Sequence, residues 1–174
     1  NMKFFLIETN TRNRLPYGIN ANRAVDVRYA NRKSSYRIPN CCVVDMKTPS
    51  EVFFPDIITE PFLMVSREVA EVIEMYTPET IFKTIYLLET ESEINATYFM
   101  PFVEEVECLS EQTKRSRGGT ELLDIVLRQD AVAEKPIFRV ARFTHVYLIV
   151  RLDAIESMLR RGTRGIKLKE LSVV

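Results

Sequence analysis

Apolar and polar positions along the chain follow patterns that predict both strands and helices. Short runs rich in β-branched and aromatic residues suit a pleated, half-buried surface and predict strands. The expected strands cover residues 3–8, 24–29, 41–46, 81–88, 97–108, 122–127, 137–140, 146–150 and 166–173. Apolar residues that recur at helical spacing predict helices over about 66–76 and 152–161.

Both predicted helices have local signals at their ends. Ser66 is a good N-cap for the first helix, and Thr77-Pro78 ends it because the residue before a proline avoids the helical conformation. In the second helix, Arg160 and Arg161 complement the dipole at the last turn, and Gly162 takes the position just beyond. These signals make the two helices the firmest local prediction.

A strand–helix–strand unit occurs twice. Residues 62–65, the first helix and residues 81–88 parallel residues 147–150, the second helix and residues 166–173. The pattern fits either a duplicated unit or two similar parts of one domain. Both interpretations predict an α+β fold in which helices lie on one face of a mostly antiparallel sheet. We expect one domain over 1–174, with 1–60 as its more variable part.

Composition is ordinary for a soluble globular protein, with 46% hydrophobic and 28% charged residues. No apolar run approaches the ~20 residues of a transmembrane helix, so no membrane partner is expected. Residues 2–8 are too short and too quickly charged for a signal peptide, which indicates a cytoplasmic protein. Three cysteines, two of them adjacent, predict free thiols, and with one histidine we expect no metal site and no cofactor.

Charge is divided into unlike blocks although the net charge is zero. Lys and Arg outnumber Asp and Glu by eight to two in residues 1–40, and by thirteen to seven in residues 113–174. In residues 41–112 the acids prevail, fifteen to three. The blocks either neutralise each other across the fold or leave an acidic face that steers a basic partner. The zero balance argues against a nucleic-acid partner.

Acidic residues alternate along the hairpin predicted over 81–108. Catalytic carboxylates lie in apolar pockets that push their pKa values apart, whereas alternation along a hairpin suits a solvated or partner-binding face. The candidate partner-binding residues are Glu89, Glu91, Glu93, Glu104, Glu105 and Glu107.

Two other motifs have candidate chemistry. His145 would need a nucleophile or an orienting carboxylate within reach to act in catalysis, and the spacing places none there, so we assign no catalytic residue. Basic clusters at 114–119 and 160–165 are compatible with phosphate contact. The second is already explained as a helix end, and it lacks the Lys-Ser/Thr of a phosphate-binding loop.

Several pieces occur in an order that resembles a known family. They are Phe62-Leu63-Met64-Val65-Ser66 with its helix, the acidic stretch at 98–110, the strand at 122–127, Ile137-Phe138-Arg139, and the final unit with Arg164-Gly165-Ile166. Over residues 61–174 the chain resembles the bacterial immunity protein family eleven of polymorphic toxin systems.

The resemblance implies a non-catalytic cytoplasmic protein that occludes a cognate toxin encoded nearby. An inhibitor of this kind needs a complementary surface rather than a reactive group. Two alternatives stay open. One is a structural or regulatory binding subunit unrelated to toxins. The other is an enzyme, which predicts a deep pocket containing His145 or the acidic cluster.

Overall fold

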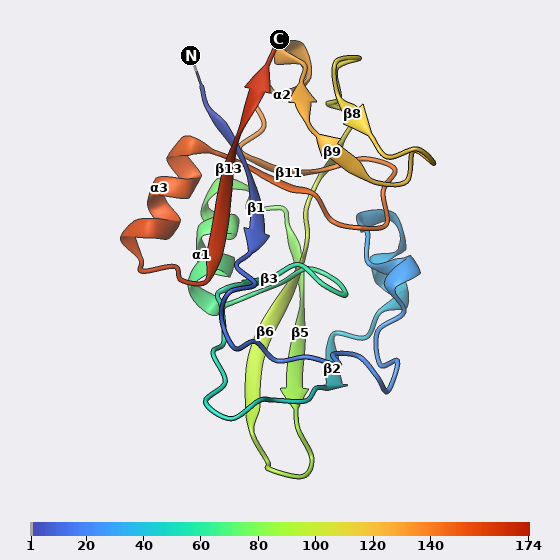
Figure 1. The fold of residues 1–174 in the computed structure, drawn as a ribbon, viewed down its shortest axis with the longest axis vertical. Helices are drawn as coiled ribbons and strands as arrows, with labels where there is room; N and C mark the ends of the chain where they lie inside the picture. The colour runs from blue at the N-terminus through green and yellow to red at the C-terminus, as the bar shows by residue number, and fades with distance from the viewer. Residues whose placement is uncertain (1) are drawn as a thin grey trace.

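The computed structural model describes residues 2–174 and has an α+β fold, as predicted (Figure 1). In chain order its elements are β1 Phe4–Thr9, η1 Val27–Tyr29, η2 Arg32–Arg37, β2 Cys41–Asp45, β3 Ile57–Ile58, β4 Met64–Val65, α1 Arg67–Tyr76, β5 Ile81–Leu88, β6 Asn95–Phe102, β7 Glu105–Val106, β8 Lys114–Arg115, β9 Leu122–Asp124, β10 Val126–Leu127, α2 Gln129–Val132, β11 Ile137–Val140, β12 Leu148–Arg151, α3 Leu152–Arg160 and β13 Ile166–Val173. The two η elements are short 3₁₀ helices.

The strands form two principal sheets, where the sequence predicted one. The first has the order β10-β13-β1-β12-β11-β7, and the second has the order β2-β5-β6-β4-β3. A separate two-stranded sheet pairs β8 with β9. Most neighbours are antiparallel; the parallel pairs are β10 with β13, β11 with β7, and β2 with β5.

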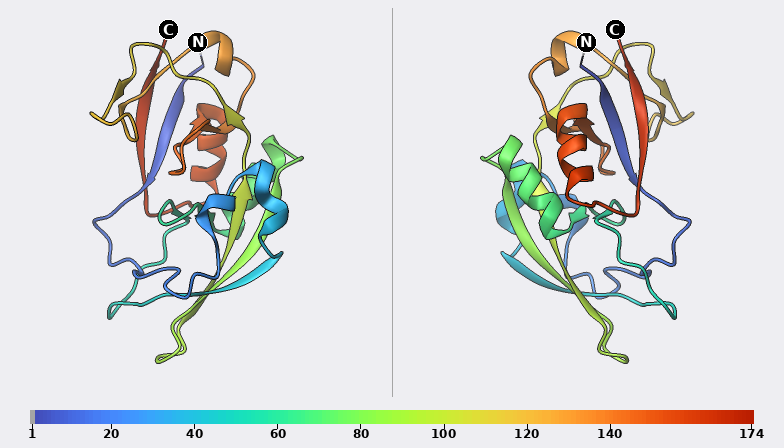
Figure 2. Two further views of the ribbon diagram at one scale, coloured as in Figure 1. Left: turned by 90° about the vertical axis from the view of Figure 1, so that its right-hand side faces the viewer. Right: turned by 90° about the vertical axis from the view of Figure 1, so that its left-hand side faces the viewer.

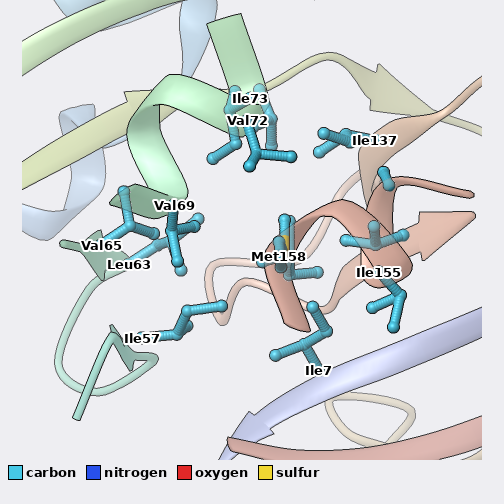
Figure 3. Close-up of a cluster of buried hydrophobic side chains, with 14 of the residues drawn as sticks. Ile7, Ile57, Leu63, Val65, Val69, Val72, Ile73, Ile137, Ile155 and Met158 are labelled. Atoms are coloured by element: carbon cyan, nitrogen blue, oxygen red, sulfur yellow. The ribbon is translucent and has the colours of Figure 1, made fainter. Parts of the chain in front are cut away.

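Helices α1 and α3 pack against each other and join the two sheets in one core (Figures 2 and 3). In Figure 3 Val69 and Ile73 of α1 and Met158 of α3 lie among side chains from both sheets, including Ile7 and Val65. Each helix therefore buries its apolar face against a partner helix as well as a sheet. This shared burial explains why a second sheet is needed, because one sheet would leave part of both faces in water.

The strand–helix–strand units predicted from the sequence have equivalent places in the two sheets. In one unit β4 and β5 flank β6, and in the other β12 and β13 flank β1. In both, the middle strand is antiparallel to its neighbours and the outer strand next to β5 or β13 is parallel. β5 and β13 have the same length and start at residues 81 and 166, the spacing of 85 seen in the sequence. The topology supports duplication, with the N-terminal strand completing the second copy.

Two strands expected from the sequence are wrong. Residues 24–29 end in the 3₁₀ helix η1, because the Asp26 carboxylate accepts a hydrogen bond from the Arg28 amide at 3.1 Å and closes a turn. The strand expected over 97–108 stops at Phe102, and the chain then crosses to the six-stranded sheet as β7. Residues 122–127 form two short strands, β9 and β10, that belong to different sheets.

Candidate functional site

The β5–β6 hairpin extends from the body of the molecule and ends in an acidic tip (Figure 1). The tip closes with a hydrogen bond from the Glu89 amide to the Ile94 carbonyl at 2.9 Å, and the Glu89 carboxylate accepts one from the Thr48 hydroxyl. Glu91 and Glu93 are exposed, and in the described part of the chain neither forms an ion pair. The tip therefore presents unneutralised negative charge to solvent.

The other predicted acidic residues lie at the far end of β6. Eight residues at ~3.4 Å each separate the two groups by about 27 Å. Glu104 pairs with Lys135 at 2.7 Å, and Glu107 accepts a hydrogen bond from Arg142 Nε at 2.6 Å. The structure thus splits the predicted set into a free tip (Glu89, Glu91, Glu93) and a largely paired group (Glu104, Glu105, Glu107).

Opposite charge blocks meet across the fold, as one of the two sequence interpretations expected. Acidic residues of the middle block contact basic residues of the flanking blocks in the pairs Arg32–Glu79, Lys135–Glu104, Arg142–Glu107 and Arg161–Glu71. Among the described residues, other exposed acids of this block form no ion pair; they are Glu51, Glu68, Glu74, Glu91, Glu93, Glu105 and Glu111. Of these, Glu91 and Glu93 lie at the end of the projecting hairpin.

An uncovered row of side chains crosses the sheet behind the tip. Val43 of β2 is in register with Tyr86 of β5, and Tyr86 is in register with Thr97 of β6, so the three share one face. Val43 is 55% exposed and Tyr86 44% exposed. On the outer edge of β2, the Asn22 side chain donates to the Val43 carbonyl and accepts from the Asp45 amide. This contact covers part of the strand edge and leaves the sheet face open.

A groove of about 630 Å³ lies on the six-stranded sheet's side of the molecule. It is lined by Glu107, Cys108, Leu109, Arg115, Gly119, Thr120, Arg128, Val140, Ala141, Arg142, Phe143, Thr144 and His145. These residues come from the chain after β7, from β8 and the loop that follows it, from the end of β10, and from the turn between β11 and β12. Residues distant in sequence therefore meet here, and the sequence could not show that these segments form one groove.

His145 lies at the groove with a carboxylate partner that the sequence did not indicate. Its Nδ1 lies 2.6 Å from Glu60 Oε1. The centre of its ring lies 4.5 Å from the centre of the Tyr147 ring, in an edge-on arrangement. Glu60 thus supplies an orienting carboxylate, which the spacing in the sequence did not place near His145. A pocket containing His145 and Glu107 is what the enzyme alternative predicts. In the described residues, however, the His145 side chain forms no hydrogen bond to a nucleophile.

Cys108 borders the groove and is not activated. The thiol is fully buried, and desolvation raises its pKa to about 11, so it stays protonated at neutral pH. Burial also raises the pKa of Cys42, whereas Cys41 on the opposite face of β2 is exposed. All three cysteines are free thiols, as predicted.

Buried Arg139 positions the turn that forms one wall of the groove. Its guanidinium donates to the carbonyls of Ala30 at 2.9 Å, Phe143 at 2.7 Å and Thr144 at 3.3 Å. Burial lowers the pKa of Arg139, an effect partly opposed by the charge of Glu105. The side chain links the end of η1, β11 and the β11–β12 turn. These hydrogen bonds explain why the charged Arg139 side chain is buried, and they give it a structural role.

The described residues contain neither a cluster of metal-ligating side chains nor a helix that could span a membrane. Between residues 2 and 174, no three His, Cys, Asp or Glu side chains are grouped so that they could hold a metal ion. The helices of this part of the chain are too short or too polar to cross a membrane.

Comparisons with known proteins add no relative. No protein-family model matches the sequence, and no curated protein matches it either. The resemblance to immunity proteins therefore stays a prediction that rests on the short motifs at 62–66, 98–110, 137–139 and 164–166.

Proposed function

We propose that this chain is a non-catalytic binding protein that neutralises a basic protein partner, a cognate toxin encoded nearby, as the family resemblance implies. The observation that carries the proposal is the β5–β6 hairpin. The exposed Tyr86 of this hairpin lies beside Val43 of the neighbouring strand β2, and the tip of the hairpin adds the unpaired carboxylates of Glu91 and Glu93. A partner with a basic rim around an apolar centre would complement this surface.

Each part of the surface has a separate task in binding. Aromatic side chains at the centre of an interface supply much of the binding energy because they bury large areas with few rotatable bonds. Tyr86 is placed for this role, with Val43 beside it. Charges at the rim mainly steer the partner and raise the association rate. The tip glutamates suit that second role because they lie in solvent at the end of the hairpin.

The paired acids contribute less to this surface. The carboxylates of Glu104 and Glu107 already have cationic neighbours, so a basic partner would gain little from them. Glu105 is exposed without an ion pair, but it lies in β7, away from the hairpin. Among the six predicted residues, we therefore assign Glu91 and Glu93, on the same hairpin as Tyr86, the main role, with Glu89 supporting the turn of the tip.

Co-expression with the product of the adjacent gene tests the proposal. We expect the neighbouring product to arrest growth, this chain to restore it, and the two proteins to purify together. A Tyr86→Ala variant should lose rescue, while Tyr36→Ala, which removes a 76% exposed tyrosine from η2, should retain it. A neighbour that is not toxic, or a toxic neighbour that is neither bound nor neutralised, would contradict the proposal.

A further inference from the structure

The groove beside His145 has a chemical character that the proposed function does not use. Three arginines from separate segments line it: Arg115 of β8, Arg128 after β10, and Arg142 in the β11–β12 turn. Among the described residues that line it, Glu107 is the one acid, and its carboxylate is engaged by Arg142. Arg128 also has a carboxylate partner, Asp130 at 3.4 Å, which lies outside the lining, whereas Arg115 forms no ion pair among the described residues. An arginine fork presents paired N–H donors that match phosphate oxygens.

Apolar side chains form another part of the lining. Leu109, Val140 and Phe143 contribute to it, and the Arg115 guanidinium lies 5.7 Å from the centre of the Phe143 ring. The groove is therefore suited to an amphipathic ligand with a charged end and an apolar or aromatic body. Its volume of about 630 Å³ falls within the ~300–1,000 Å³ typical of small-molecule sites. An inorganic phosphate ion alone would leave most of it unfilled.

The backbone around the groove is held in place before any ligand binds. Arg142 has a positive φ of 74°, a conformation uncommon outside glycine. Such residues persist where the surrounding structure fixes them, and they are frequent at binding sites. Here the Ala141 amide donates to the Val106 carbonyl at 3.0 Å, and the Arg139 guanidinium donates to the Phe143 carbonyl at 2.7 Å. These contacts fix the turn that presents Arg142 to the groove.

We propose that this groove binds a phosphorylated small molecule of nucleotide size, with Arg115, Arg128 and Arg142 on the phosphates and the Phe143 side on its less polar body. The basic cluster at 114–119, singled out in the sequence as compatible with phosphate contact, contributes Arg115 and Gly119 to this site. The groove is separate from the β5–β6 hairpin, so a negative result for one proposal would not bear on the other.

Isothermal titration calorimetry with ADP, pyrophosphate, inorganic phosphate and adenosine tests this site. We expect ADP to bind most tightly, pyrophosphate less tightly, and phosphate and adenosine weakest. Charge-assisted hydrogen bonds are worth enough that Arg115→Gln or Arg142→Gln should weaken ADP binding about tenfold each. Arg160→Gln, which removes an exposed arginine of α3 outside the groove, should leave binding unchanged.

Thermal unfolding of each variant serves as the folding control, since the groove arginines are exposed and their replacement should not unfold the protein. The proposal is overturned if the native protein binds none of the phosphorylated probes. It is also overturned if binding survives unchanged in the Arg115 and Arg142 variants. If pyrophosphate binds as tightly as ADP, the role assigned to Phe143 is contradicted. If an oligoglutamate peptide binds more tightly than ADP, the ligand is an acidic peptide and not a phosphorylated small molecule.

Discussion

Gly165 shows how a single residue can couple distant segments. Its φ is +77°, and a Cβ added there would lie 2.5 Å from Pro55 Cβ and 2.6 Å from a Phe53 ring carbon. Its carbonyl accepts a hydrogen bond from the Asn10 amide at 2.8 Å. The absence of a side chain therefore lets the loop before β13 approach two other parts of the chain. The sequence identified a glycine near a helix end but contained no signal of this close packing.

Replacing Gly165 with alanine should destabilise the fold more than the same change at Gly162. Gly162 also has a positive φ, +83°, but no other described part of the chain comes within 4 Å of the place a Cβ would take. Gly162→Ala should therefore lower the free energy of unfolding only by the ~1–2 kcal/mol of backbone strain. Gly165→Ala adds overpacking of ~1–3 kcal/mol. Urea unfolding of both variants measures the difference, and equal losses would contradict the packing argument.

The three thiols should react at very different rates. Cys41 is exposed, whereas Cys42 and Cys108 are buried with raised pKa values. Because the thiolate is the reactive form, a thiol reagent at pH 8 should modify one cysteine rapidly and the other two only on unfolding. Cys41 and Cys42 are neighbours in β2, so their side chains point to opposite faces of the sheet. Mass spectrometry of the labelled peptides checks the assignment, and rapid modification of Cys108 would refute it.

At the scale of elements, helix α3 begins without a side-chain cap. Its N-cap is Arg151, which makes no capping hydrogen bond. Asp153 in the first turn lies near the positive end of the helix dipole and accepts hydrogen bonds from Arg151 Nε at 2.7 Å and Nη2 at 2.9 Å. The hydrogen bond to Arg151 holds the pKa of Asp153 below its usual value.

Asp153→Asn should lower stability at neutral pH and flatten its acid dependence. Since the folded pKa lies below the unfolded value of about 3.8, the carboxylate stabilises the fold above that pH. The stabilisation is lost as the pH falls through the folded pKa. The free energies of unfolding of the native protein and the variant should therefore converge as the pH falls below 3.8 and through the folded pKa. Parallel pH profiles, measured by chemical denaturation from pH 2 to 7, would contradict this role.

Element prediction from sequence succeeded where the signal was local. The run 81–88 and the helix capped by Ser66 have the predicted bounds, because alternation, helical spacing and a cap are written in neighbouring residues. The prediction of a strand failed over 24–29, because the Asp26 carboxylate accepts a hydrogen bond from the Arg28 amide and closes a turn there. It also failed beyond Phe102, because a parallel pairing with β11 lies more than thirty residues away.

At the scale of the whole molecule, the second sheet depends on pairings that local patterns cannot reveal. β1 lies between β12 and β13, so the first strand of the chain completes a sheet built from the last. The repeat spacing of 85 residues suggested two similar units, but not that the N-terminus supplies the missing strand of one. The groove has the same origin, since its arginines converge only after β8, β10 and β11 are assembled.

Segregated charge also acquires its meaning only in the whole fold. The sequence left open whether the acidic block is neutralised or forms a partner surface. Within residues 2–174, the structure pairs Glu71, Glu79, Glu104 and Glu107 with Lys or Arg side chains and leaves other exposed acids, including Glu91 and Glu93, without an ion pair. The proposed function assigns the partner-binding acidic surface to the projecting hairpin, and this assignment is its central claim.

Binding kinetics of the co-purified partner with a Glu91→Lys/Glu93→Lys variant test that claim most directly. Charge reversal at the tip should slow association at least tenfold at low salt, with a smaller effect at high salt, because exposed charges act mainly through screened steering. The matched control is Glu134→Lys/Glu156→Lys, which reverses two exposed acids outside the hairpin. The account predicts a large decrease in the association rate for the tip variant alone. Equal association rates for the native protein and the tip variant at both salt concentrations would contradict it.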